Sequence, residues 1–171
     1  MNLQFDTSLI QKYNSASQMA RVITESWVAQ NIFCPNCGNI LNSYENNRPV
    51  ADFYCATCKE QFELKSKNGS FGKKITDGAY ETMIKRLESS ENPNFFFLNY
   101  ELKTRQIHNF IVMPKHFFTS HSIEKRKPLS QNAKRAGWVG CNILLYELPD
   151  SGKIFYINNR IVQSKDSILE K

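Results

Sequence analysis

The sequence predicts an α/β domain in which helices flank a mixed β-sheet. One segment, residues 15–30, carries apolar residues at helical spacing, while "EQFELKSK" alternates between apolar and polar residues as a half-buried strand does. The run "NFFFLNY" is almost wholly apolar, which is typical of a central strand. Together with the neighbouring segments, the order along the chain is helix, strand, strand, helix, strand, strand, and this order favours a mixed sheet with helices on its faces.

Two helices are expected. In the first, over residues 15–30, the apolar positions are three or four residues apart, at Met19, Val22, Ile23 and Trp27. The second is expected from Asp77 to Ser89, with Asp77 as its N-cap and apolar residues on one face.

The expected strands surround these helices. "VADFYC" and "EQFELKSK" precede the second helix, and "NFFFLNY" and "HNFIVM" follow it. Near the end of the chain, "VGCNILLY" and "KIFYI" are expected as two strands joined through "ELPDSG", which supplies turn residues. Residues 114–138 are expected to be irregular and basic.

Length and composition indicate one domain over residues 1–171, with 41% hydrophobic and 22% charged residues. No apolar run is long enough to span a membrane. The first residues, "MNLQFDTSLI", lack the basic start and apolar run of a signal peptide, so we expect a cytoplasmic protein. The net charge of +6 suits an anionic partner, although an excess of this size also occurs in proteins that bind nothing acidic.

Four of the five cysteines form two C-x2-C pairs, "CPNC" at Cys34 and Cys37 and "CATC" at Cys55 and Cys58. Paired knuckles at this separation are typical of a structural zinc site with four cysteine ligands, predicted here in a module spanning about residues 33–60. The alternative, four reduced cysteines in a core, does not explain the paired spacing. Cys141 lies in the apolar run "VGCNILL" and is expected in a core.

Two carboxylates and a lysine follow one another at Asp52, Glu63 and Lys65, with Pro49 shortly before them. Such a set can perform Mg²⁺-dependent phosphodiester hydrolysis, because Mg²⁺ prefers oxygen ligands and activates a bound water. Asp52, Glu63 and the carbonyl of Leu64 are the candidate Mg²⁺ ligands, and Lys65 could orient the water or stabilise developing charge. The spacing also occurs by chance, in which case these residues are solvated charges on a surface hairpin.

The second cysteine pair lies between the two acidic positions, so its knuckle forms the turn that joins their strands. A zinc ion in that turn would fix the relative position of Asp52 and Glu63, as a Mg²⁺ site with strict geometry requires. The cysteines are thus expected to hold the site in place without taking part in its chemistry.

Several strings extend this pattern over nearly the whole chain: "CPNCGN", "ENNRPVADFYC", "FELKSK", "DGAY", "NPNFFFL", "RKPL" and "RAGWVGCNI". In the same order, they resemble the catalytic domain of methyl-directed restriction endonucleases of the DpnI type, within the PD-(D/E)xK nuclease superfamily. The resemblance implies a type IIM enzyme that cuts duplex DNA at 5'-GATC-3' when the adenine is methylated. It also implies Asp52, Glu63 and Lys65 as catalytic residues. Members of that family continue into a winged-helix domain, which this sequence is expected to lack.

A basic segment is the candidate DNA-binding region. Its cations are Lys115, Lys125, Arg126, Lys127, Lys134 and Arg135. These could neutralise phosphates or read guanine edges, or they could form a solvated loop. Trp138, which follows in "RAGW", could contact the adenine methyl groups or belong to a core.

Other side chains carry weaker expectations. His108, His116 and His121 lie apart from the acidic residues in sequence and are expected at strand or loop surfaces. Glu25, on the first helix, could add an outer carboxylate to the metal site, or it could be an ordinary helix-surface residue.

Taken together, the sequence predicts a monomeric nuclease for methylated GATC in duplex DNA, with catalytic Mg²⁺ and structural Zn²⁺. Two alternatives stay open. One is a nuclease or nickase of the same fold with relaxed methyl dependence, and the other is a non-catalytic zinc-ribbon module that binds DNA.

Overall fold

The protein, described here from a computed structural model, folds as two compact units. Residues 1–45 and 51–171 are described, so Pro49, which precedes the acidic set, and Val50, the first residue of the predicted strand "VADFYC", lie outside the described residues. Unit 1 comprises residues 1–70, 93–113 and 153–171, and unit 2 comprises residues 71–92 and 114–152. That the chain acts as one domain stays a prediction.

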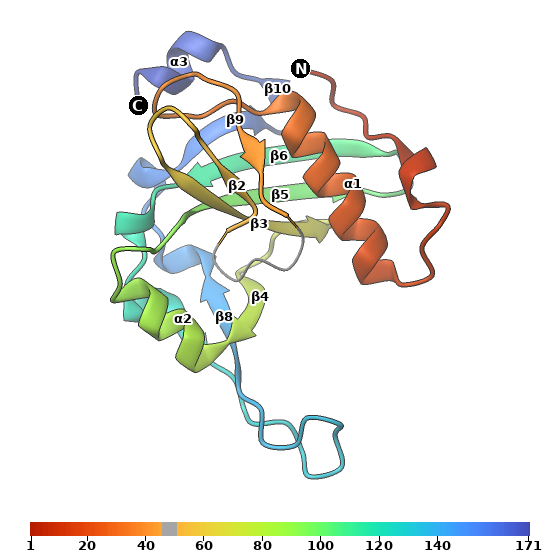
Figure 1. Cartoon of the computed structure of the whole chain (residues 1–171), viewed down its shortest axis with the longest axis vertical. Coiled ribbons are helices and arrows are strands. Elements are labelled where there is room, and N and C mark those ends of the chain that lie inside the picture. The colour runs from red at the N-terminus through yellow and green to blue at the C-terminus, as the bar shows by residue number, and fades with distance from the viewer. Residues whose placement is uncertain (46–50) are drawn as a thin grey trace. The chain divides into compact units, whose positions relative to one another are not determined.

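Unit 1 is built on a mixed sheet, as the sequence predicts. Among the described residues, the strand order is β1 (Asn42–Ser43), β2 (Phe53–Tyr54), β3 (Gln61–Asn68), β5 (Asn94–Glu101), β6 (Gln106–Met113), β9 (Ile154–Asn158) and β10 (Ile161–Val162). Strands β3 and β5 are parallel, and the other neighbours are antiparallel (Figure 1). The run "NFFFLNY" forms β5, which lies between β3 and β6 in the sheet and is buried along almost its whole length.

The core of unit 1 lies between this sheet and the first helix, α1 (Ala16–Asn31), close to the predicted range. Figure 1 shows α1 crossing the strands. Its buried face includes Trp27, whose ring centroid lies 5.7 Å from that of Phe110 in β6. Within the sheet, Phe62 of β3 stacks on Phe96 of β5 with the ring planes 7° apart. The apolar spacing in the sequence thus identifies the face of α1 that packs.

Unit 1 also contains two short helices. The 3-10 helix η1 (Thr7–Ile10) is capped by Asp6, whose carboxylate accepts a hydrogen bond from the Ser8 amide. Helix α3 (Lys165–Leu169) is capped by Ser164, which accepts from the Ser167 amide. The ammonium of Lys165 donates to the carbonyl of Gly38, so α3 contacts the segment that carries the first cysteine pair.

Unit 2 has an antiparallel sheet, in the order β4 (Lys74–Ala79), β8 (Gly140–Leu144) and β7 (Ile123–Lys125) among the described residues. The helix α2 (Tyr80–Leu87) begins three residues later than predicted. Asp77 is not its N-cap: it lies in β4 opposite Cys141, and its side chain accepts from the Gly78 amide. Pairing with β8 therefore overrides the helical tendency of residues 77–79.

The rest of unit 2 is largely irregular, as expected for residues 114–138. It holds short 3-10 helices, η2 (Lys115–Phe117), η3 (Ser120–Ser122), η4 (Leu145–Glu147) and η5 (Asp150–Gly152). Strands β8 and β9 follow one another along the chain, but β8 pairs in the sheet of unit 2 and β9 pairs with β6 in unit 1. No helix in the described part of the chain is both long and apolar enough to cross a membrane.

Candidate active site

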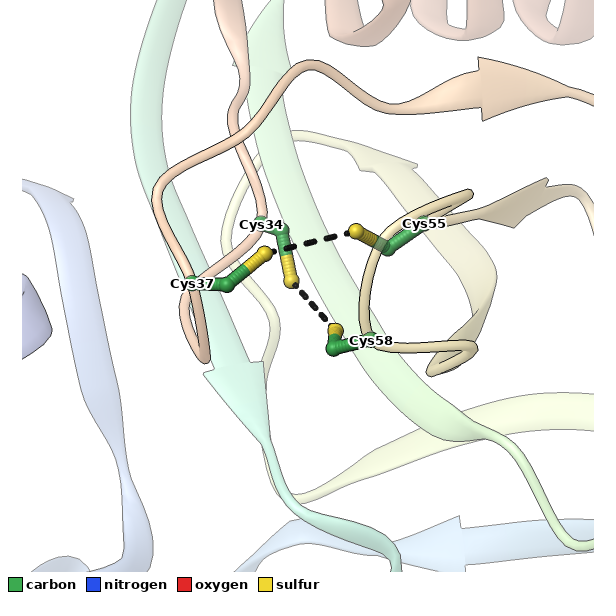
Figure 2. A group of neighbouring side chains, drawn as sticks. All are labelled: Cys34, Cys37, Cys55 and Cys58. Atoms are coloured by element: carbon green, nitrogen blue, oxygen red, sulfur yellow. Dashed lines mark hydrogen bonds between the residues drawn. The ribbon is translucent and has the colours of Figure 1, made fainter.

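The four paired cysteines meet in unit 1, as their spacing predicts. The Sγ atoms of Cys34 and Cys58 lie 3.5 Å apart, those of Cys37 and Cys55 lie 3.4 Å apart, and all four lie within 4.8 Å of one another (Figure 2). A tetrahedral zinc ion with Zn–S bonds of about 2.3 Å separates its sulfurs by about 3.8 Å. The cluster therefore fits a structural zinc ion. Cys141 lies elsewhere, buried in β8 with its thiol donating to the Gly78 carbonyl.

The two knuckles have the same backbone design. In the first, the Cys34 amide donates to the Asn39 carbonyl and the Gly38 amide donates to the Cys34 carbonyl. The second repeats this with Cys55, Glu60 and Lys59. The residue in fourth place after each first cysteine has a left-handed backbone, with φ of +72° at Gly38 and +66° at Lys59. Glycine adopts this conformation freely, whereas lysine does so at a cost.

The environments of the thiols differ. Hydrogen bonds from the side chain and backbone of Asn39 lower the pKa of Cys37 to about 6, so this thiol ionises readily. Burial raises the pKa of Cys34 well above its usual range. A bound Zn²⁺ would supply the positive charge that holds all four as thiolates.

The predicted catalytic residues lie together on the hairpin that carries the second knuckle. Strand β2 pairs with β3 so that Phe53 faces Phe62, and the Asp52 amide donates to the Phe62 carbonyl. The carboxylate of Asp52 accepts a hydrogen bond of 2.7 Å from the Leu64 amide. Two residues apart on β3, Glu63 and Lys65 point to the same side, and their side chains form an ion pair of 2.5 Å.

These side chains line a cavity of about 420 Å³ between the hairpin and α1. The hairpin contributes Asp52, Glu63, Leu64, Lys65 and Ser66, and α1 contributes Ser17, Ala20, Arg21, Thr24 and Glu25. The side chains of Lys65 and Glu63 are only 16% and 15% exposed, so their ion pair is partly shielded from water. Glu25 also lines the cavity, which is compatible with its expected place as an outer carboxylate of the metal site.

The cavity concentrates negative charge. Burial raises the pKa of Asp52 to about 6, and the charges of Glu63 and Glu25 add to this rise, while the Leu64 amide and Lys65 oppose it. Of the residues that the structure describes, three carboxylates and two cations line the cavity. A hard divalent cation with oxygen ligands fits this donor set, and Asp52, Glu63 and the Leu64 carbonyl are the residues that would hold it.

The full length of the chain, residues 1–171, matches the model of the DpnI, Dam-replacing family. The chain belongs to this family. Membership indicates a methyl-directed restriction nuclease with DNA as its substrate.

The cations predicted to bind DNA lie in unit 2. Lys125, Arg126, Lys127, Lys134 and Arg135 are exposed, whereas Lys115 in η2 is half-buried. Residues 126–139 form the loop between β7 and β8, which extends away from the start of β8 (Figure 1). The base of this loop is closed by the Arg126 amide, which donates to the Gly140 carbonyl. The nearby acid, Glu124, pairs with Lys74 and accepts from Asn142.

Trp138 lies in this loop, half-buried. The guanidinium of Arg135 stacks over its ring, with 4.5 Å between the guanidinium carbon and the ring centroid. On another side the ring sits close to Gly140, where an added Cβ would lie 2.8 Å from two ring atoms. Half-burial is compatible with both interpretations of Trp138, the packing role and the methyl-contacting role.

The other predicted residues are not part of the cavity. Neither His108, His116 nor His121 is among the described residues that line it. Arg21 does line it, and sequence reasoning missed this residue. Its one signal is that Ser17, Arg21 and Thr24 give α1 a polar stripe one turn apart, beside the apolar face that packs on the sheet.

Proposed function

We propose that the protein is a Mg²⁺-dependent type II endonuclease that hydrolyses duplex DNA at 5'-GATC-3' when the adenine is methylated. The observation that carries the proposal is the gathering of Asp52, Glu63 and Lys65 at one cavity in a chain of this family. The architecture of unit 1 supports the PD-(D/E)xK fold, because α1 covers a sheet in which the β2–β3 hairpin carries the acids and β3 runs parallel to β5.

In this proposal Asp52, Glu63 and the Leu64 carbonyl hold Mg²⁺. When bound there, the ion would neutralise the charge that builds on the phosphate and would lower the pKa of an attacking water. The Leu64 amide fixes the Asp52 carboxylate through the 2.7 Å hydrogen bond, so one ligand is oriented before any ion arrives. Lys65, beside Glu63, orients the water or stabilises the charge that develops on the phosphate.

The cysteine cluster has a positional role. With Zn²⁺ bound, Cys55 and Cys58 fix the turn between β2 and β3, the two strands that position the acidic ligands. The ion therefore acts on catalysis through the geometry of the hairpin. Cleavage should be lost when zinc is removed, even in excess Mg²⁺.

Recognition is assigned to unit 2. We propose that Lys115, Lys125, Arg126, Lys127, Lys134 and Arg135 contact the DNA backbone and guanine edges. Trp138 contacts the adenine methyl groups. The protein acts as a monomer in the cytoplasm, where it cuts incoming methylated DNA one strand at a time.

The test is digestion of plasmid DNA from methylating and non-methylating hosts, at low salt, with and without Mg²⁺. Fragments ending at GATC from the methylated plasmid alone support the proposal. Equal cutting of both plasmids points to a nuclease without methyl dependence. If neither plasmid is cut but DNA is bound, the protein is a zinc-containing binding module. Asp52→Asn is the control that separates this site from a contaminating nuclease.

A further inference from the structure

Arg21 and Glu25 lie on the α1 side of the cavity, whereas the residues of the predicted triad lie on the hairpin. The Nε atom of Arg21 donates to Glu25 Oε1 at 2.6 Å. The two side chains are 45% and 27% exposed, and both line the cavity that also holds Asp52, Glu63 and Lys65. An acid and a base from α1 therefore share the space in which a phosphate would react.

Stabilisation of the helix is a weak reason for this ion pair. Exposed pairs four residues apart contribute only about 0.3–0.5 kcal/mol. The order of the two residues along the helix is also the less favourable one, because a pair in which the acidic residue precedes the basic residue suits the helix dipole better. Residues 21 and 25 lie in the middle of α1, where neither helix end benefits from them. Their place at the cavity is the feature that distinguishes them.

The Arg21–Glu25 pair on α1 resembles the Lys65–Glu63 pair on the hairpin side of the cavity. On β3, Lys65 is held by Glu63, and on α1, Arg21 is held by Glu25. In both pairs a carboxylate that lines the cavity accepts from the neighbouring cation. A divalent cation that draws the carboxylates towards itself weakens their hold on Lys65 and Arg21 together.

The charges that line the cavity agree with such a weakening of the two ion pairs by a divalent cation. With all groups ionised, the three carboxylates exceed the two cations by one negative charge among the described residues that line the cavity. One divalent cation reverses this to one positive charge, which balances a single phosphodiester. Without Arg21, the cation-loaded cavity would have no net charge with which to hold the phosphate. Arg21 also has the planar fork of donors that suits a phosphate better than a lysine ammonium does.

We propose that Arg21 binds the phosphodiester at the cleavage site, and that Glu25 holds Arg21 until a divalent cation enters the cavity. This inference rests on the proposed nuclease function. Arg21 thus couples metal loading to substrate binding, since the cavity gains its phosphate-binding cation when the metal arrives.

The test uses the whole chain with zinc bound and a DNA duplex of about two helical turns that carries one GATC methylated on both strands. Binding is measured in Ca²⁺ and without divalent ions over a range of salt, and cleavage is measured in Mg²⁺ under single-turnover conditions. The variants are Arg21→Gln, Arg21→Lys and Glu25→Gln. Lys103→Gln, in the exposed turn after β5, is the matched control for loss of one positive charge.

Arg21→Gln is expected to slow cleavage by about 100-fold, and to flatten the dependence of log K on log salt in Ca²⁺ by about one. Arg21→Lys should recover part of the rate. Lys103→Gln should leave both quantities near the wild-type values. If Arg21→Gln behaves as Lys103→Gln does in rate and in salt dependence, the proposal is wrong.

Glu25→Gln gives an independent result. It should tighten DNA binding without divalent ions by about 3-fold or more, because the loss of the Glu25 charge weakens the hold on Arg21 before any metal arrives. In the Arg21→Gln background the same change should gain clearly less, because only the lost charge of Glu25 then acts. An equal gain in the two backgrounds would mean that Glu25 does not act through Arg21 and would overturn the proposal.

The proposed function and the role of Arg21 fail separately. Absence of Mg²⁺-dependent cleavage by the wild type refutes the proposed function. The binding measurements in Ca²⁺ and in divalent-free buffer then still decide whether Arg21 contacts phosphate.

Discussion

The charge on Asp52 is expected to destabilise the protein when no divalent cation is bound. Its pKa is raised from 3.8 to about 6, chiefly by burial. A carboxyl whose pKa is higher in the folded state binds its proton more tightly there, so its contribution to stability falls as the pH rises. The loss begins near the unfolded value of 3.8 and is complete above about pH 6.

The size of the effect follows from the two pKa values. The difference between 3.8 and about 6, at 1.36 kcal/mol per pH unit, costs about 3 kcal/mol at pH 8 and about half of that at pH 5. Asp52→Asn removes the charge and keeps an oxygen that can accept from the Leu64 amide. Part of the gain is offset because the new amide group also needs a partner. We therefore expect Asp52→Asn to raise the free energy of unfolding by about 1–3 kcal/mol at pH 8.

The assay is urea denaturation of the zinc-loaded wild type and variant at pH 5 and pH 8, without added divalent cations. Comparing the two proteins at each pH cancels the pH dependence of the zinc site. Asp6→Asn is the control of opposite sign, because hydrogen bonds from Ser8 lower the pKa of Asp6, and its loss should not stabilise the fold. An Asp52→Asn variant no more stable than the wild type at pH 8 would refute the reasoning.

Four further predictions concern the knuckles and the loop. Cys55→Ser should lower the melting temperature by about 10 °C or more. A zinc chelator should lower the melting temperature of the wild type but should not lower that of the variant any further. A wild type whose melting temperature does not respond to the chelator would exclude a structural zinc. Lys59→Gly should stabilise the protein by about 0.5–1 kcal/mol in urea denaturation, because glycine tolerates the φ of +66°, and a destabilised variant would contradict this. Gly140→Ala should displace the ring of Trp138 and reduce the preference for methylated over unmethylated duplex by about 10-fold. Trp138→Ala should reduce it at least as much; a large fall in melting temperature with equal loss on both duplexes would instead favour a packing role for Trp138.

The sequence predicts best those features that depend on neighbours along the chain. The spacing of the cysteine pairs predicts a cluster because each knuckle is a local turn, and the two knuckles need only one ion to meet. The helical period of α1 and the apolar run of β5 are similarly local. The acidic set is visible in the sequence because Asp52 and Glu63 lie on the two arms of one short hairpin.

The features that the sequence did not predict depend on contacts between segments that lie far apart along the chain. Strand β4 includes residues assigned to a helix, because pairing with β8, more than 60 residues away, decides their conformation. The pattern of β8 and β9 gave no sign that they belong to different sheets. Arg21 resembles an ordinary helix-surface cation until the fold brings α1 beside the hairpin, so its role could not be recognised from spacing alone.

Unit 2 is built from two separate segments of the chain, and this affects the order of folding. Residues 71–92 leave after β3 and return at β5, and residues 114–152 leave after β6 and return at β9. The β5–β6 hairpin lies between them and needs only a short turn to close. Once it has formed, the effective loop separating β4 from β8 is much shorter, which lowers the entropy cost of their pairing. We therefore expect the hairpin to belong to the folding nucleus, and unit 2 to become ordered late on the pathway.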